Sequence, residues 1–318
     1  MKISRRQFLN AAGSLAAISA AQQAAHALPG SVLLHSPGNL SSFDVKQVHG
    51  PSRIRIGYAA ITWGDSLTQA ITDIASLGYK GIQLRANAVK LFPDPAALKA
   101  ELGQANLNFT ALSSGDIALD PSEEAANLTL HEDHAKYLSA AGGNYLQLLG
   151  TFRTDGKFTA EEYIRTGKLL TEIGKRAADH GVQIGFHNHM GSIAQSPEQL
   201  AKILDAADPR YVKLLLDVAH YKQGGGDPAV AVRQYADRLL YVHFKDVKPA
   251  DTSNGYEFVE LGQGTVDLPA VVAALRAIHF HGWAIVEFDR EPAGSTRTPK
   301  ESAQLSKSYV EHTLGLPV

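Results

Sequence analysis

From residue 53 onward, short apolar runs alternate with longer segments whose apolar residues recur at helical spacing. Runs that are apolar on both faces are typical of buried parallel strands. Because a helical segment separates each run from the next, we predict a single α/β domain over residues 51–318, a (β/α)8 TIM barrel. A doubly wound open sheet is the alternative. The eight predicted strands are 54–58, 81–84, 108–112, 145–149, 183–186, 212–216, 240–244 and 283–286.

Start and stop signals mark the helices between these strands. Four segments pair an N-cap residue with an acid or amide three positions later, namely 120–123, 159–162, 196–199 and 298–301. Three of them also carry proline at the first helical position. Glycines that end helices before the next strand are predicted at Gly78, Gly142, Gly181 and Gly282.

The first 27 residues have the pattern of an export signal. Ser4-Arg5-Arg6-Gln7-Phe8-Leu9 is a twin-arginine motif, an Ala-rich stretch follows, and Ala25-His26-Ala27 fits a cleavage site. We therefore predict a twin-arginine signal peptide over 1–27, a flexible N-terminal segment over 28–50, and a periplasmic protein exported by the twin-arginine machinery. A disordered basic N-terminus is the alternative. The apolar stretch is too short and too polar for a stable membrane anchor.

Composition narrows the chemistry. The chain has 30 Lys and Arg against 32 Asp and Glu, a formal net charge of −2, and no basic run. This balance argues against a nucleic-acid partner or an anionic membrane surface. The absence of cysteine excludes a disulfide framework and thiolate metal ligands. A metal site in this chain must therefore be built from His, Asp and Glu.

Imidazole and carboxylate groups follow four consecutive predicted strands. In a barrel the active site lies at the carboxyl ends of the strands, so these groups are expected on one rim. Convergent N and O donors from separate rigid elements are what a divalent cation needs. Each residue taken alone has a simpler explanation, such as a helix cap or an ion pair. The prediction of a metal site therefore depends on the whole cluster. The cluster consists of His187, His189, Asp217, His220, His243 and Glu287.

Four other rim residues are candidates for substrate binding, namely Trp63, Arg85, Gln147 and Lys245. Trp63 follows the first predicted strand and either packs against a sugar ring or plugs the mouth of the barrel. Lys245 either binds a substrate oxygen or pairs with the neighbouring Asp246. The pattern alone does not decide between these roles.

The order of motifs resembles that of the xylose-isomerase-like TIM barrel superfamily of sugar isomerases and epimerases. Within it, residues 60–64 and 186–191 are most similar to the inosose dehydratases, which remove water from a keto-inositol. The resemblance extends from Ile54 to about Tyr309. The motifs in order are Asp217-x-x-His220, His243-x-Lys245-Asp246, Gly262-x-Gly264-x-x-Asp267 and Gly282-Trp283-x-x-x-Glu287.

The resemblance implies a divalent metal, typically Mn, Co, Zn or Mg, held by His187, Asp217, His243 and Glu287. Many relatives carry glutamate where this chain has His187, and often also where it has Gln83. Residues two apart on a strand share a face, so His189 competes with His187 for the metal. We favour His187 because it occupies the position of the relatives' ligand.

The resemblance also implies proton abstraction from a carbon next to a carbonyl. We predict a metal-dependent keto-sugar or keto-cyclitol lyase (dehydratase), with a sugar isomerase or epimerase acting through a metal-stabilised enediolate as the alternative. Candidates for proton transfer are Glu287, His189 and His220. Two other classes remain, a metallo-endonuclease of damaged DNA and a sugar-binding barrel without activity. An oligomeric assembly is compatible with the sequence.

Overall fold

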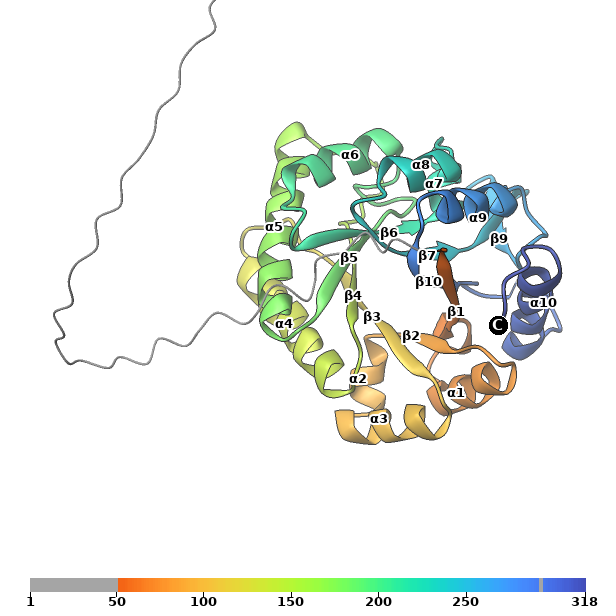
Figure 1. Cartoon of the computed structure of the whole chain (residues 1–318). Coiled ribbons are helices and arrows are strands. Elements are labelled where there is room, and N and C mark those ends of the chain that lie inside the picture. Colours follow the sequence, from red (N-terminus) through yellow and green to blue (C-terminus); the bar gives the residue numbers. More distant parts are fainter. Residues whose placement is uncertain (1–50, 292–293) are drawn as a thin grey trace, which may run out of the picture. The chain divides into compact units, whose positions relative to one another are not determined.

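The computed structural model describes residues 51–291 and 294–318, and these residues form the predicted (β/α)8 barrel (Figure 1). Neighbouring strands are parallel, and the sheet closes in the order β1-β10-β7-β6-β5-β4-β3-β2. The predicted signal peptide at 1–27 and the segment at 28–50 lie outside the described residues. The barrel strands are β1 (Arg53–Ala59), β2 (Gly81–Arg85), β3 (Asn108–Asp116), β4 (Tyr145–Leu149), β5 (Gln183–His187), β6 (Val212–Asp217), β7 (Leu239–Phe244) and β10 (His281–Val286).

Helices surround the barrel on its outer side (Figure 1). Short helical turns lie on the connections at η2 (Ala60–Trp63), α2 (Asn87–Leu91) and α7 (Val218–Gln223). No helix within 51–291 or 294–318 is long and apolar enough to cross a bilayer. The other helices are α1 (Leu67–Ser76), α3 (Pro95–Gln104), α4 (Glu124–Ala140), α5 (Ala160–Asp179), α6 (Pro197–Ala206), α8 (Pro228–Gln234), α9 (Leu268–Ala277) and α10 (Pro299–His312).

Three of the four predicted capping signals form complete capping boxes, at the starts of α5, α6 and α10. The fourth was placed too early. Asp120 accepts a hydrogen bond from the backbone N–H of Ser122 in a turn, and α4 begins only at Glu124. The expectation for Gly282 is also wrong, because His279 takes the left-handed conformation after α9, with a φ of 54°. Gly282 lies within β10, where a Cβ would meet the ring of Phe280.

The barrel interior is filled by side chains. Tyr145 and Tyr241 stack with ring centroids 5.5 Å apart, and the Arg55 guanidinium lies 4.4 Å from the centre of the buried Trp283 ring. A second, larger apolar core lies between the strands and the surrounding helices. The interior cluster consists of Ala59, Ala111, Leu215, Tyr241, Trp283 and Ile285. Because the interior is packed, a binding site is confined to the rim at the carboxyl ends of the strands.

An antiparallel hairpin that the pattern did not predict, β8 (Asp246–Pro249) and β9 (Tyr256–Val259), follows β7. The Asp246 carboxylate anchors it by accepting hydrogen bonds from the backbone N–H groups of Val247, Gly262, Gly264 and Val266, at 2.9–3.0 Å. A Cβ at Gly264 would meet this carboxylate. Asp246 and the glycines of its motif therefore fix the hairpin and the loop that follows it. Asp246 does not form an ion pair with Lys245.

Candidate metal centre and active site

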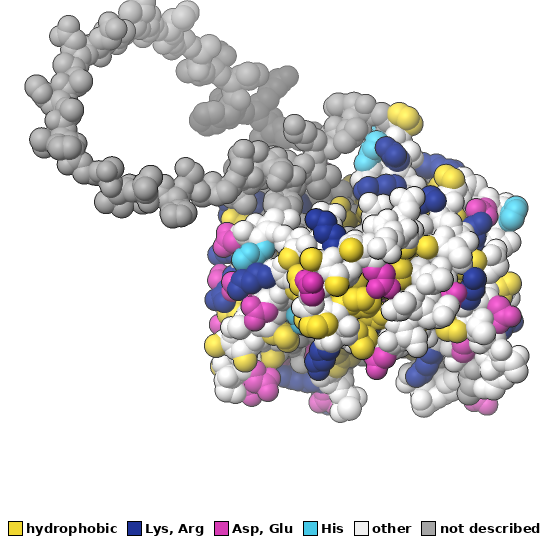
Figure 2. Space-filling model, turned by 90° about the horizontal axis from the view of Figure 1, so that it is seen from below, with side chains coloured by type: hydrophobic (Ala, Val, Ile, Leu, Met, Phe, Trp, Pro, Cys, Tyr) yellow, Lys and Arg dark blue, Asp and Glu magenta, His cyan; other side chains and the backbone are white. Residues whose placement is uncertain are grey.

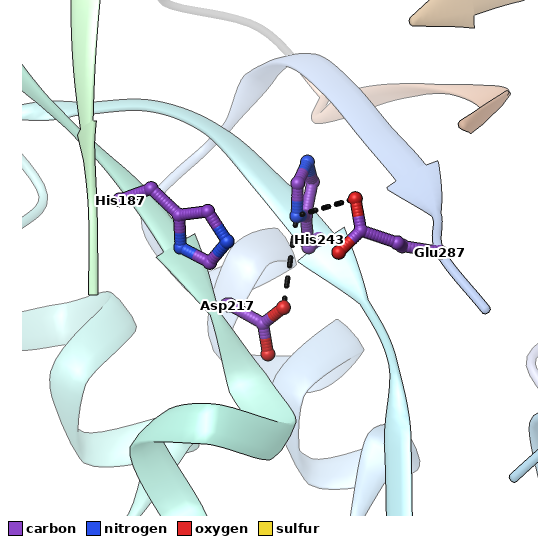
Figure 3. A group of neighbouring side chains, drawn as sticks. All are labelled: His187, Asp217, His243 and Glu287. Carbon is purple, nitrogen blue, oxygen red and sulfur yellow. Dashed lines mark ion pairs between the residues drawn. The ribbon is translucent and has the colours of Figure 1, made fainter. Parts of the chain in front are cut away.

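Four buried side chains predicted as metal ligands converge on one point at the rim (Figure 3). His187 ends β5, Asp217 ends β6, His243 lies on β7, and Glu287 follows β10 directly. Each residue offers one donor atom, and these atoms all lie within 4.8 Å of one another. Two imidazoles and two carboxylates from four separate strands form a donor set suited to a divalent cation.

Unsatisfied polar atoms in this group support a cation site. Among the described residues, His187 Nδ1, Asp217 Oδ2 and His243 Nδ1 are buried without a hydrogen-bond partner. His243 Nδ1 lies 3.4 Å from Glu287 Oε2 and 3.6 Å from Asp217 Oδ2. Burying polar atoms without partners is costly, and a cation bound among the four ligands would give Asp217 Oδ2 and His243 Nδ1 a partner. The residues present therefore fit a metal ion.

A chain of amides orients the His243 ring. Its Nε2 lies 3.0 Å from Gln83 Oε1, and Gln83 Nε2 donates to Gln147 Oε1 at 2.7 Å. Because an amide oxygen only accepts, Nε2 of His243 carries the hydrogen, and the Nδ1 lone pair faces the other three ligands. Gln83 thus positions a metal ligand.

The surroundings of His243 also affect its protonation. Burial lowers its pKa, but the carboxylates of Glu287 and Asp217 outweigh burial and raise the pKa to about 9. Without a cation, a second proton on this ring partly balances the two carboxylates. Binding of a metal ion at neutral pH would therefore require the loss of this proton from His243.

The two carboxylate oxygens of Asp217 have different partners. Oδ1 accepts hydrogen bonds from the backbone N–H groups of Ala219 and His220, both at 2.9 Å, and so caps α7. Oδ2 is left to face the metal ligands. The Asn188 side chain holds the backbone of Asp217 from the neighbouring strand by donating to its carbonyl and accepting from its N–H. Asn188 was not predicted as a site residue.

Lys245 is buried beside the metal ligands and neutralises their charge. Its ammonium donates to Asp289 Oδ1 at 2.6 Å and to Glu287 Oε1 at 3.1 Å. Burial lowers the pKa of Lys245, but Asp289 and Glu287 outweigh burial and raise the pKa above its usual value. The charged Lys245 occupies one oxygen of Glu287 and leaves the other for a cation.

The His189 and His220 rings contact each other with centroids 3.8 Å apart and planes inclined by 36°, but they differ in chemistry. His189 Nδ1 lies 2.7 Å from the carbonyl oxygen of Met190, so Nδ1 carries the hydrogen and Nε2 has a free lone pair. His220 Nδ1 accepts from the Met190 N–H at 3.1 Å, and its Nε2 lies 3.4 Å from the Lys245 ammonium, so neither ring nitrogen of His220 is free. Burial lowers the pKa of both rings, so both are neutral at pH 7. Only His189 has a free basic nitrogen.

A cavity of about 540 Å³ opens beside the metal ligands. Of the predicted site residues, Arg85, Gln147, His187, His189 and Glu287 line it, whereas Asp217, His220, His243 and Lys245 lie behind its wall. Lining residues that were not predicted as site residues include Asp65, Asn87, Asp116, Phe152 and Asp289. Asp289 lies two residues after Glu287, so the same-face rule for strands would have indicated it. The loop residues gave no such signal.

Trp63 does not line this cavity. Its indole N–H donates to Asp73 Oδ2 on α1 at 3.0 Å, and its ring meets Tyr58 edge-on with centroids 5.7 Å apart. Only 7% of the residue is exposed. The expectation that Trp63 faces the substrate is not met, because the η2 turn directs the side chain outward against α1.

Comparisons with known proteins agree with this architecture. The profile of the family "Xylose isomerase-like TIM barrel" matches residues 71–309. An inosose dehydratase of Lacticaseibacillus casei is 31% identical over 299 residues, which cover 83% of this chain and 98% of that protein. The IOLI protein with a bound zinc atom has a TM-score of 0.69 and 21% identity, covering 82% of this chain and 98% of that one. A probable 3-DHS dehydratase of Bacillus anthracis has a TM-score of 0.70 and 16% identity, covering 82% of this chain and 100% of that one.

Proposed function

Because the chain belongs to the xylose isomerase-like TIM barrel family, a family of enzymes, we propose that it removes water from a keto-sugar or keto-cyclitol. The observation that carries the proposal is the ligand cluster of His187, Asp217, His243 and Glu287 with one free base, His189, on the adjoining cavity wall. The 31% identity with a protein named inosose dehydratase supports the same reaction class.

The four ligands would hold a divalent cation, which would supply Lewis acidity to stabilise the negative charge that develops on the substrate carbonyl. His189 Nε2 takes the proton from the carbon next to the carbonyl, because its Nδ1 hydrogen is fixed on the Met190 carbonyl. The hydroxyl on the following carbon then leaves with the electron pair. His189 returns the proton to it, and water is released.

Epimerisation needs a second acid–base group beside the substrate. The site offers few candidates for that group, so we favour elimination. Lys245 and His243 face the two oxygens of Glu287, and both ring nitrogens of His220 face a partner, the Met190 N–H and the Lys245 ammonium. The alternative, a sugar isomerase or epimerase, gains support from Asp289, whose carboxylate also lines the cavity. That carboxylate already accepts a hydrogen bond from the Lys245 ammonium at 2.6 Å.

Product analysis tests the proposal. Protein stripped with a chelator and reloaded with Mn, Co, Zn or Mg is incubated with keto-inositol and with oxidised glycosides in D₂O, and products are followed by NMR. We expect a dehydrated product with the metal-loaded protein alone. A product epimeric at the carbon next to the carbonyl would support the isomerase instead, and no reaction with any metal would contradict both.

Charge distribution does not favour the nucleic-acid alternative. On the side shown in Figure 2, basic and acidic side chains are interspersed, without a continuous basic stripe. A phosphate backbone is bound by clustered Lys and Arg, so this arrangement fits a small neutral substrate better than DNA. The sugar-binding barrel without activity is the other alternative. It is countered by the complete set of converging ligands.

We also propose that the protein works in the periplasm after export through the twin-arginine machinery. Replacing Arg5 and Arg6 together with lysine should trap the unprocessed precursor in the cytoplasm, because the export receptor reads the arginine pair. Fractionation and immunoblotting measure this, with the nearby Lys2→Arg as a control that keeps the pair. If the double variant still yields processed enzyme in the periplasm, the protein is exported by another route.

A further inference from the structure

We propose that the outer half of the cavity is a second subsite that binds a further ring attached to the keto ring. The substrate would then be an oxidised glycoside rather than a free keto-cyclitol. This inference rests on the proposed function and names its substrate class. The cavity volume of about 540 Å³ lies within the range of roughly 300–1,000 Å³ that is typical of sites for larger organic ligands. One six-membered ring leaves much of this space unfilled.

The two ends of the cavity differ in how far their side chains are buried. The inner end carries the buried polar groups of His187, Gln147 and Glu287, each no more than 5% exposed. The outer end carries Asp116 and Phe152, which are exposed to solvent. A keto ring held at the inner end therefore leaves the outer end free for a substituent.

Phe152 is the main recognition element of this outer end. The residue is 43% exposed, yet its ring contacts the proposed base, His189, edge-on with centroids 5.2 Å apart. An antiparallel bridge to Ser192 holds its backbone in place. An exposed aromatic ring fixed inside a cavity offers a flat apolar surface to a sugar ring or an aromatic aglycone. Because the ring touches His189, a group stacked on it would be continuous with a keto ring at the base.

Charged groups complete the outer end. Arg85 and Asp116 both line the cavity and are exposed, and neither forms an ion pair with another described residue. A guanidinium offers several donors and a carboxylate two acceptors, so together they suit the hydroxyls of a second sugar ring. Stacking on Phe152 with polar contacts at its edge is the pattern expected for such a ring.

A matched pair of substrates tests the inference on the metal-loaded protein. One is a keto-cyclitol, and the other is a keto-glycoside whose six-membered keto ring carries a phenyl or glucosyl group. We expect Phe152→Ala to lower the ratio of kcat/KM for the two-ring over the one-ring substrate roughly tenfold, mainly through KM, as one aromatic stack is lost. Phe152→Tyr should keep the ratio. Leu305→Ala, a change at an equally exposed residue on α10 outside the cavity, is the control.

The outcomes separate the inference from the proposed function. A wild-type preference for the one-ring substrate, or a ratio that Phe152→Ala leaves unchanged, would overturn the second subsite. If neither substrate turns over, the proposed function fails, and saturation-transfer NMR with unoxidised phenyl glucoside still decides the subsite. Binding that Phe152→Ala abolishes and Phe152→Tyr retains would support it, whereas binding that is absent or independent of Phe152 would refute it.

Discussion

Asp217→Asn is expected to weaken metal binding by about 100-fold or more and to abolish turnover, while the fold stays intact. Oδ1 of Asp217 must accept two backbone N–H groups of α7, so the asparagine oxygen takes that position. The new NH₂ group then lies where Oδ2 now faces His243 and Lys245. A cation would meet a donor in place of a negative oxygen.

Metal content by mass spectrometry, kcat and circular dichroism check this expectation. Asp227→Asn is a matched control, because Asp227 caps the next helix, α8, by accepting from the backbone N–H groups of Ala229 and Val230 and lies outside the ligand group. The control variant should keep both metal and activity, since asparagine caps a helix about as well as aspartate. Full metal content and near wild-type activity in Asp217→Asn would mean that the metal lies elsewhere.

His187→Ala and His189→Ala are expected to fail in different ways. His187 belongs to the converging ligand group, so its loss should empty the metal site. The Nδ1 atom of His189 is occupied by the Met190 carbonyl, and its ring lines the cavity. His189→Ala should therefore retain metal but lower kcat by roughly 100- to 10,000-fold, the usual contribution of a general acid–base group.

A third variant sharpens this comparison. His187→Glu restores an oxygen ligand at the same strand end and should recover metal binding that His187→Ala has lost. With a divalent cation, the present ligand set has a formal charge of zero, and a glutamate at position 187 would change this charge to −1. The added negative charge should weaken the cation as a Lewis acid and so reduce kcat. If His187→Ala keeps its metal and His189→Ala loses it, the two roles must be exchanged.

The barrel could be predicted from the sequence because eight short runs rich in apolar residues alternate with helical segments. Predicted strand ends placed the carboxylates and imidazoles on one rim, and the structure brings four of them together. The β8–β9 hairpin escaped prediction because buried and half-buried residues are mixed in strands of only four residues. Such short, mixed strands give little periodic signal.

Features that depend on side-chain direction could not be predicted. Trp63 was expected at the mouth from its position after β1, but the η2 turn rotates it away. The role of Gln83 depends on contacts with Gln147 and His243 from strands far apart in the sequence. Phe152 lies in a loop, where no period relates sequence to orientation.

The placement of the tryptophans affects how this protein can be observed. Its two tryptophans, Trp63 and Trp283, are 7% and 4% exposed, and neither lines the cavity. One lies between β1 and α1, and the other fills the barrel interior beside Arg55. Intrinsic fluorescence should therefore be blue-shifted in the native protein and shift to the red when the barrel opens. Ligands in the cavity do not touch either indole, so emission reports denaturation rather than occupancy.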